Sequence, residues 1–137
     1  MSNLDAWNTV PTLRGQHVTL QPLQMEHVPG LRDALEGSGL DQLWYTQVPD
    51  AKTMTSYVQA ALQAQAEGKV LPFVVFDAND HIVGTTRYYD LQADVPRLSI
   101  GYTWYGESVQ RTGVNSETKL MLLSHAFERL ECLSVVF

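Results

Sequence analysis

The first part of the chain alternates apolar and polar residues in a way that predicts one strand followed by one helix. In residues 17–23 apolar side chains recur at about every second position, which is typical of a half-buried strand, at Val18, Leu20 and Leu23. The apolar spacing then changes to the three and four residues of a helix face, at Val28, Leu31 and Leu35. Each of the two elements is therefore expected to bury one side.

A second helix is predicted over residues 54–67, where apolar residues again recur at spacings of three and four. Gly68 follows at a position that commonly ends a helix. Residues 36–50 separate the two helices and contain glycines, a proline and the aromatic pair Trp44 and Tyr45. This composition indicates a loop that carries a hydrophobic patch.

Three consecutive strands are predicted in the middle of the chain. Residues 72–77 and 82–91 are rich in β-branched and aromatic residues and flank a short polar turn at residues 78–80, as in a hairpin. Residues 97–105 have the same composition and follow a further turn. Because strands joined by short turns pair antiparallel, the three strands predict an antiparallel meander.

A long helix and a last strand complete the pattern. The helix spans residues 114–130, and its buried face is expected to contain Leu120, Leu123, Phe127 and Leu130, with Leu122 and Ala126 beside it. Residues 131–137 then favour a strand. Because a helix between two strands usually makes them parallel neighbours, we predict an α+β (mixed α/β) fold in which an antiparallel meander precedes a helix crossover to a parallel strand.

Composition and charge narrow the class of protein. A length of 137 residues predicts a single domain over residues 1–137, and 45% hydrophobic with 18% charged residues is near the average for soluble globular chains. The net charge of -6, from 9 basic and 15 acidic residues, provides no basic stripe for a phosphate backbone. Nucleic acid is therefore not expected as a partner.

Membrane, disulfide and metal functions are not indicated by the sequence. The N-terminus lacks the features of a signal peptide, and no window approaches the ~18 apolar residues that span a bilayer. Cys132 is the single cysteine, which fits a reducing compartment and a place in the core, so a cytoplasmic protein is expected. No metal site is expected, because no helical metal-ligand spacing is shared by His17, His27, His81 and His125.

A polar segment at residues 110–115 lies between a predicted strand and the start of the long helix. A helix N-terminus has N–H groups without intrahelical partners and the positive end of the helix dipole, so it favours an anion. Gly113 would allow either close approach of a phosphate or a backbone angle that other residues avoid. Asn115 and Ser116 suit the first turn of a helix. The segment therefore indicates an anion site.

The residues that carry a resemblance to a known family are Gln110, Arg111, Thr112, Gly113, Val114 and Asn115. In this order they resemble the pyrophosphate-loop signature Arg/Gln-x-x-Gly-x-Gly/Ala of the GNAT superfamily of acyl-CoA N-acetyltransferases, with Asn115 at the sixth position. Residues 99–103 and 117–123, and the opening residues 13–23, look like the Rim-type, ribosomal-protein-acetylating branch. The resemblance covers residues 13–137 in matching element order.

The resemblance implies an acyl-CoA N-acyltransferase-like mixed sheet, with acetyl-CoA as co-substrate and no metal. The implied function is direct transfer of an acetyl group to a primary amine, either a protein N-terminus or a small amine, within a ternary complex. Loop amides would hold the pyrophosphate, and the strand before the loop would pair with the pantetheine arm. The implied CoA-binding residues are Thr103, Trp104, Tyr105, Gln110, Arg111, Thr112, Gly113, Val114, Asn115 and Ser116.

The attacking amine must lose a proton, so a base or a water chain is required near the end of this strand. The local candidates are Tyr102, Ser99 and Glu107. Tyr102 is alternatively a core aromatic and Glu107 a solvated carboxylate, while Ser99 stands where relatives often have a carboxylate. Five further residues have two possible roles, which are to line an acceptor pocket or to pack in the core or its rim. They are Arg87, Tyr88, Tyr89, Trp44 and Tyr45.

Members of the superfamily usually continue past the fifth strand with a further helix, which often carries a tyrosine that protonates the thiolate. The sequence stops at Phe137, so the resemblance implies a domain truncated after the fifth strand and incomplete at its C-terminus. An open apolar edge at residues 133–137 favours a homo-oligomer that pairs through this edge. The alternative function is a catalytically impaired CoA-binding or dimerisation module. A third possibility is a domain that has neither activity.

Overall fold

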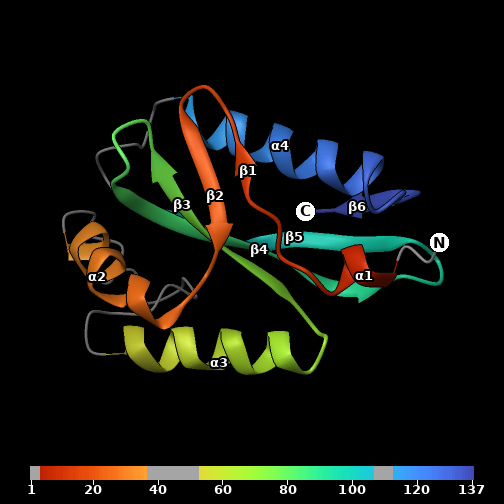
Figure 1. The fold of residues 1–137 in the computed structure, drawn as a ribbon, viewed down its shortest axis with the longest axis horizontal. Helices are drawn as coiled ribbons and strands as arrows, with labels where there is room; N and C mark the ends of the chain where they lie inside the picture. Colours follow the sequence, from red (N-terminus) through yellow and green to blue (C-terminus); the bar gives the residue numbers. More distant parts are fainter. Residues whose placement is uncertain (1–3, 37–52, 107–112) are drawn as a thin grey trace.

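A computed structural model describes residues 4–36, 53–106 and 113–137, in which a sheet is covered by helices on both faces (Figure 1). The loop predicted around Trp44 and Tyr45 lies outside the described residues. In chain order the elements are α1 (Leu4–Trp7), β1 (Leu13–Arg14), β2 (Val18–Pro22), a 3-10 turn η1 (Met25–His27), α2 (Val28–Glu36), α3 (Met54–Ala66), β3 (Leu71–Asp77), β4 (Ile82–Gln92), β5 (Arg97–Tyr105), α4 (Val114–Glu128) and β6 (Ser134–Val136).

The sheet of the described residues has six strands in the order β1-β2-β3-β4-β5-β6. Neighbouring strands pair antiparallel from β1 to β5, and β6 pairs parallel to β5 after the α4 crossover. The predicted meander and the parallel crossover are therefore confirmed. The strand count was wrong, because β1 has only two residues and gives no period-2 signal, so the last strand is the sixth rather than the fifth.

The helices divide the molecule into three layers (Figure 1). The helix α4 covers one face of the sheet, and α2 and α3 cover the other. Each face has its own cluster of buried residues. Leu20, Phe73 and Leu122 belong to the cluster under α4, whereas Leu31, Val58 and Trp104 belong to the cluster under α2 and α3. We refer to the two sides as the α4 face and the α3 face.

The buried side of α4 differs from the predicted one. Leu120 is 64% exposed and Phe127 is 47% exposed, so the prediction that they face the core was wrong. The buried positions follow a spacing of four residues, at Val114, Thr118, Leu122 and Ala126, and continue to Leu130 after the helix. The small side chains at positions 118 and 126 allow the helix to approach the sheet closely. The prediction favoured the largest apolar residues, which in this helix do not mark the packed side.

The end of α3 confirms the role predicted for Gly68. Gly68 has φ 76°, and its N–H donates to the Gln65 carbonyl at 2.9 Å. The N–H of Lys69 donates to the Ala64 carbonyl, also at 2.9 Å. This pair of bonds is the Schellman motif, which needs a residue in the left-handed region. The chain is thereby directed straight into β3.

Cys132 is buried beside α4, as expected for a core cysteine. Within residues 4–36, 53–106 and 113–137, no helix has both the length and the apolar content needed to cross a membrane.

Candidate functional site

The outer edge of β5 changes its neighbour partway along the strand. β6 pairs with β5 at Arg97, Leu98 and Ser99. From residue 100 to 105, no described strand pairs with this edge. The N–H of Gly106 donates to the Val83 carbonyl on the β4 side at 2.7 Å, and backbone directions alternate along a strand. The backbone groups of Thr103 and Tyr105 therefore point to the outer edge, where an extended ligand can add as a strand.

A β-bulge lies in β5 at the same level. Thr85 pairs with Trp104 and Arg87 pairs with Gly101, so residues 102 and 103 of β5 oppose the single residue 86 of β4. Tyr102 has φ 54°, which is uncommon for a residue other than glycine. The family resemblance implies a bulge on this strand, and the register places it at residues 102 and 103. The bulge redirects backbone groups beside the open edge.

Gly113 precedes the first turn of α4. Its φ is -76°, so the alternative that this glycine supplies a positive φ was wrong. A Cβ built at Gly113 meets no described atom within 4 Å. Neither the backbone angle nor packing within the described residues requires glycine here, and the described residues leave space beside its backbone. Because a helix N-terminus carries the positive end of the helix dipole, the start of α4 is a candidate anion site.

A groove of about 570 Å³ opens beside this helix start, between α4 and the turn that joins β1 to β2. Gly113, Ser116 and Glu117 line it from α4, and Gly15 lines it from the turn. The Glu117 carboxylate accepts the backbone N–H of His17 at 2.9 and 3.2 Å. A Cβ on Gly15 would lie 2.0 Å from the Glu117 Oε1 atom, so a side chain at this position would displace the carboxylate from its place beside the turn. The β1–β2 turn therefore anchors the start of α4, an interaction that the sequence analysis missed.

The three residues predicted to bind the pantetheine arm have different side-chain environments. The Thr103 hydroxyl lies 2.7 Å from the Thr86 hydroxyl. The Trp104 ring is buried in the cluster under α2 and α3, and Tyr105 packs against the α4 cluster. Burial raises the pKa of the Tyr105 hydroxyl. Because the rings of Trp104 and Tyr105 are packed inside, only their backbone groups are suited to contact a ligand.

The candidates for the proton acceptor also differ in access. Ser99 is buried, with 4% exposure, whereas Tyr102 is 43% exposed. Tyr102 is therefore not a core aromatic. Glu107 and the loop residues Gln110, Arg111 and Thr112 lie outside the described residues.

An aromatic and cationic cluster lies on the α3 face next to the bulge. The Arg87 Cζ atom lies 4.4 Å from the centre of the Tyr102 ring and 5.4 Å from the centre of the Tyr57 ring. The Tyr89 and Tyr102 rings meet edge to face, with centroids 5.1 Å apart. We name Tyr57, Arg87, Tyr89 and Tyr102 the arginine cluster. For Arg87 and Tyr89 the sequence leaves an acceptor pocket and rim packing open, and it gives no sign that Tyr57 joins them.

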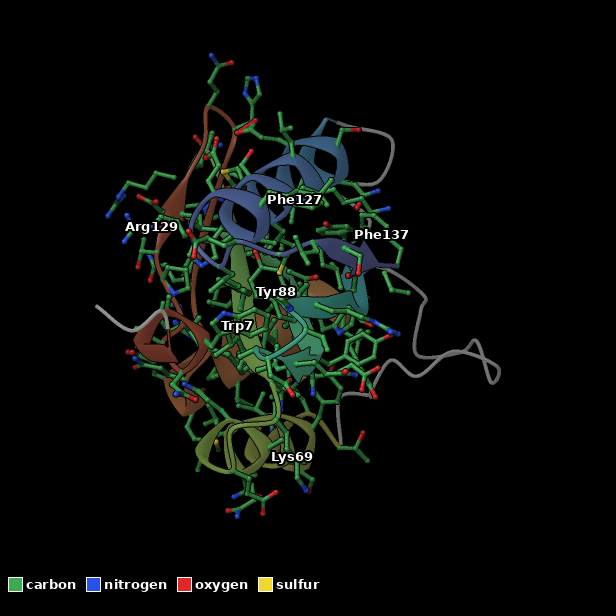
Figure 2. The ribbon with its side chains drawn as sticks, turned by 90° about the vertical axis from the view of Figure 1, so that its right-hand side faces the viewer. Trp7, Lys69, Tyr88, Phe127, Arg129 and Phe137 are labelled. Atoms are coloured by element: carbon green, nitrogen blue, oxygen red, sulfur yellow. The ribbon has the colours of Figure 1, made fainter. Side chains whose placement is uncertain are left out.

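Tyr88 does not belong with these residues, so of its two predicted roles the place in the core is confirmed. Its ring is fully buried on the α4 face, where its hydroxyl donates to the Leu122 carbonyl. The ring also stacks on His125, with centroids 6.1 Å apart. Figure 2 shows Tyr88 between α4 and the sheet, with Lys69 on the opposite side at the end of α3. Successive residues of a strand face opposite ways, which separates Tyr88 from its neighbours.

No group of three or more metal-ligating side chains gathers within the described parts of the chain. His125 lies on the α4 face, and burial, with a smaller effect of Arg129, lowers its pKa. Burial likewise lowers the pKa of His27, which stands at the start of α2. Both imidazoles are held by packing and lie on different elements.

Comparison with known protein families and structures gives a consistent result. The profile of the acetyltransferase (GNAT) domain family matches residues 17–137. No curated protein sequence matches the chain significantly.

Several solved structures share the fold. A structure from Vibrio cholerae, described as a candidate ribosomal-protein-serine acetyltransferase, matches with a TM-score of 0.78 at 21% identity, over 91% of this chain and 71% of that one. Mycobacterium smegmatis RimJ, in complex with CoA-disulfide, matches with a TM-score of 0.73 at 18% identity, over 93% and 67%. A Salmonella typhimurium acetyltransferase that modifies the N-terminal serine of 50S ribosomal subunit protein L7/L12 matches with a TM-score of 0.71 at 18% identity, over 87% and 69%. The predicted acyl-CoA N-acyltransferase fold is confirmed, and Rim-type acetyltransferases are among the structures that share it.

Proposed function

The chain belongs to the acetyltransferase (GNAT) domain family of acyl-CoA-dependent N-acetyltransferases, and we propose that it transfers an acetyl group from acetyl-CoA to a primary amine by direct attack in a ternary complex. The acceptor class that we favour is a protein N-terminus, with a small amine as the second possibility. The Salmonella neighbour modifies an N-terminal serine, which supports this choice by similarity of fold.

The observation that carries the proposal is the coincidence of three features along β5 and α4. The outer edge of β5 is open from residue 100 to 105 in the described chain, the bulge at Tyr102 lies on that stretch, and the N-terminus of α4, preceded by Gly113, follows it in sequence. An open strand edge suits the amide groups of a pantetheine arm. A helix N-terminus with a bare glycine suits a pyrophosphate.

The residues present fit acetyl-CoA as a co-substrate. Gly113 leaves space for a phosphate oxygen to approach the backbone, and Asn115 and Ser116 are exposed in the first turn of α4. Thr103 and Tyr105 direct backbone groups to the open edge. We assign the pyrophosphate to the start of α4, with Gln110, Arg111, Thr112 and Val114 completing the binding loop.

The proposed reaction needs no covalent enzyme intermediate. The amine nitrogen forms a bond to the acetyl carbon, the carbon–sulfur bond breaks, and its electron pair leaves on the thiolate. The proton lost by the amine passes to a base or a water chain. Backbone N–H groups redirected by the bulge are suited to stabilise the developing oxyanion. The protein's main contribution is therefore orientation and electrostatic stabilisation.

We propose Tyr102 as the side chain nearest to the proton transfer, because its exposed ring stands at the bulge itself. Ser99 is buried and lies where β5 still pairs with β6, so it suits a relay through water rather than direct contact. Glu107 stays a third candidate.

Two measurements test the proposed function. Acetyl-CoA titration by calorimetry should show saturable binding, and a thiol-release assay should show turnover with peptides that have a free N-terminal amine. The same peptides with acetylated N-termini are the matched controls and should release no thiol. Absence of acetyl-CoA binding at any accessible concentration contradicts the proposal.

A catalytically impaired CoA-binding or dimerisation module is the second candidate, and one observation favours it. Large apolar side chains are exposed at and beyond the last strand, at Leu133 (80%), Val136 (41%) and Phe137 (63%). Such an apolar edge is suited to pairing with a second copy. Acetyl-CoA binding without turnover, together with a dimer in analytical ultracentrifugation, would support this candidate. A monomer at all concentrations would contradict the homo-oligomer.

A further inference from the structure

Arg87 is a partly buried cation on the α3 face that has no ion-pair partner among the described residues. Its guanidinium instead lies over the rings of Tyr102 and Tyr57, at 4.4 and 5.4 Å from their centres. A guanidinium held against aromatic rings still has N–H donors that an anion can accept. The arginine cluster therefore has a place for an anion that a ligand can supply.

The contacts of Arg87 determine which kind of anion fits. A guanidinium is planar, and aromatic rings occupy its faces while its N–H donors point outward along its edges. Two parallel N–H groups on one edge match the two oxygens of a carboxylate. Contact with two tyrosine rings restricts the Arg87 side chain, so less side-chain freedom is lost when an anion binds.

The position of Arg87 relates this anion site to the proposed reaction. Arg87 pairs with Gly101, so it is adjacent to the bulge at Tyr102. The α4 face at this level is filled by the buried core around Tyr88. An acceptor must therefore reach the thioester from the α3 face. A cavity of about 390 Å³ on that side is lined by Tyr89 and Tyr102 and provides room beside them.

We propose that Arg87 determines acceptor specificity by binding a carboxylate close to the reacting amine. This inference rests on the proposed function and names its substrate class, which is a peptide N-terminus with Asp or Glu at one of the next positions. The net charge of -6 would on its own favour cationic acceptors. Contact with Arg87 would favour an acidic acceptor at short range, against the long-range attraction of cationic acceptors.

The test compares two acceptor peptides that differ only in Glu or Gln near the N-terminal amine. The wild-type protein should acetylate the Glu peptide with a kcat/KM about tenfold higher, as expected for one charge-assisted interaction. In Arg87→Gln the ratio of the two kcat/KM values should fall to about one, whatever the absolute rate with either peptide. Arg97→Gln is the matched control, because Arg97 is exposed at the start of β5, and it should keep the wild-type ratio.

Two further outcomes are informative. An unchanged Glu-to-Gln ratio in Arg87→Gln, or no preference in the wild-type protein, overturns the inference while leaving the proposed function intact. If the wild-type protein acetylates no amine, the proposed function fails, and calorimetry of the two peptides then tests Arg87 alone through loss of Glu-peptide binding. Should Arg87→Gln lower the fold stability, Arg87→Lys keeps the charge and should retain part of the preference without the bidentate contact.

Discussion

Tyr88 and Tyr89 are neighbours on β4 and have opposite environments. Tyr88 is fully buried on the α4 face, where it donates a hydrogen bond to α4 and stacks on His125. Tyr89 is partly buried on the α3 face, where it meets Tyr102 and lines a cavity. One step along a strand reverses the direction of the side chain. At this level of β4 the α4 face is therefore packed core, while the α3 face beside the bulge is accessible to a ligand.

The two faces also differ in how they treat ionisable groups. On the α4 face burial raises the pKa of Tyr88 and of Cys132 and lowers the pKa of His125. Each of these shifts favours the neutral form of its group. Beside the bulge, the α3 face carries the guanidinium of Arg87 instead. An acceptor carboxylate can therefore be recognised on the α3 face at this level.

Replacing Tyr88 and Tyr89 by alanine should give the largest difference between the two faces in the free energy of unfolding. Tyr88→Ala should lower the free energy of unfolding by about 3 to 5 kcal/mol, because it removes a fully buried aromatic ring and leaves a cavity. Tyr89→Ala should lower it by only about 1 kcal/mol, because its ring is partly exposed. Urea-induced unfolding measures both values. Equal losses would contradict the division of roles between the two faces.

A smaller effect is expected from the pH dependence of stability. The pKa of His125 is lowered by burial, so below about pH 6.5 the unfolded chain binds more protons than the folded one. The free energy of unfolding should therefore fall as the pH decreases from about 6.5. In His125→Phe this fall should be shallower but not absent, because the pKa of His27 is lowered too.

Urea unfolding at a series of pH values measures this slope. His17→Gln is the matched control, since the His17 side chain is exposed and only its backbone N–H is bonded, and it should keep the wild-type slope. An unchanged slope in His125→Phe would show that this imidazole is not held neutral by the α4 face.

Local patterns were sufficient to predict much of the fold. The strand over residues 97–105 was predicted with the bounds that β5 has, because β-branched and aromatic residues lie between two polar turns. The buried side of α4 was predicted less well, because its apolar residues form two overlapping stripes and only contact with the sheet selects one. The short elements α1 and β1 were missed, because four and two residues are too few to establish a period.

The candidate site was predictable where it is contiguous in sequence. The candidate anion site at the start of α4 was predicted from one short segment, residues 110–115, and the strand before it was predicted from residues 97–105. The arginine cluster was only partly predictable, because Tyr57 on α3 meets Arg87 on β4 through tertiary packing. The sequence left both a pocket and a core role open for Arg87, Tyr88 and Tyr89, and the alternation of side chains along β4 places Tyr88 in the core.

The central claim is that the start of α4 holds the phosphates of acetyl-CoA, and Gly113→Val tests it most directly. No described atom lies within 4 Å of the added Cβ, and φ is -76°, so the free energy of unfolding should fall by no more than about 1 kcal/mol. Glu128→Val places the same side chain at the exposed far end of α4 and serves as the control. Calorimetry should show acetyl-CoA binding at least about tenfold weaker in Gly113→Val and unchanged in Glu128→Val. Equal affinity in a folded Gly113→Val protein would show that this helix start does not hold the phosphates.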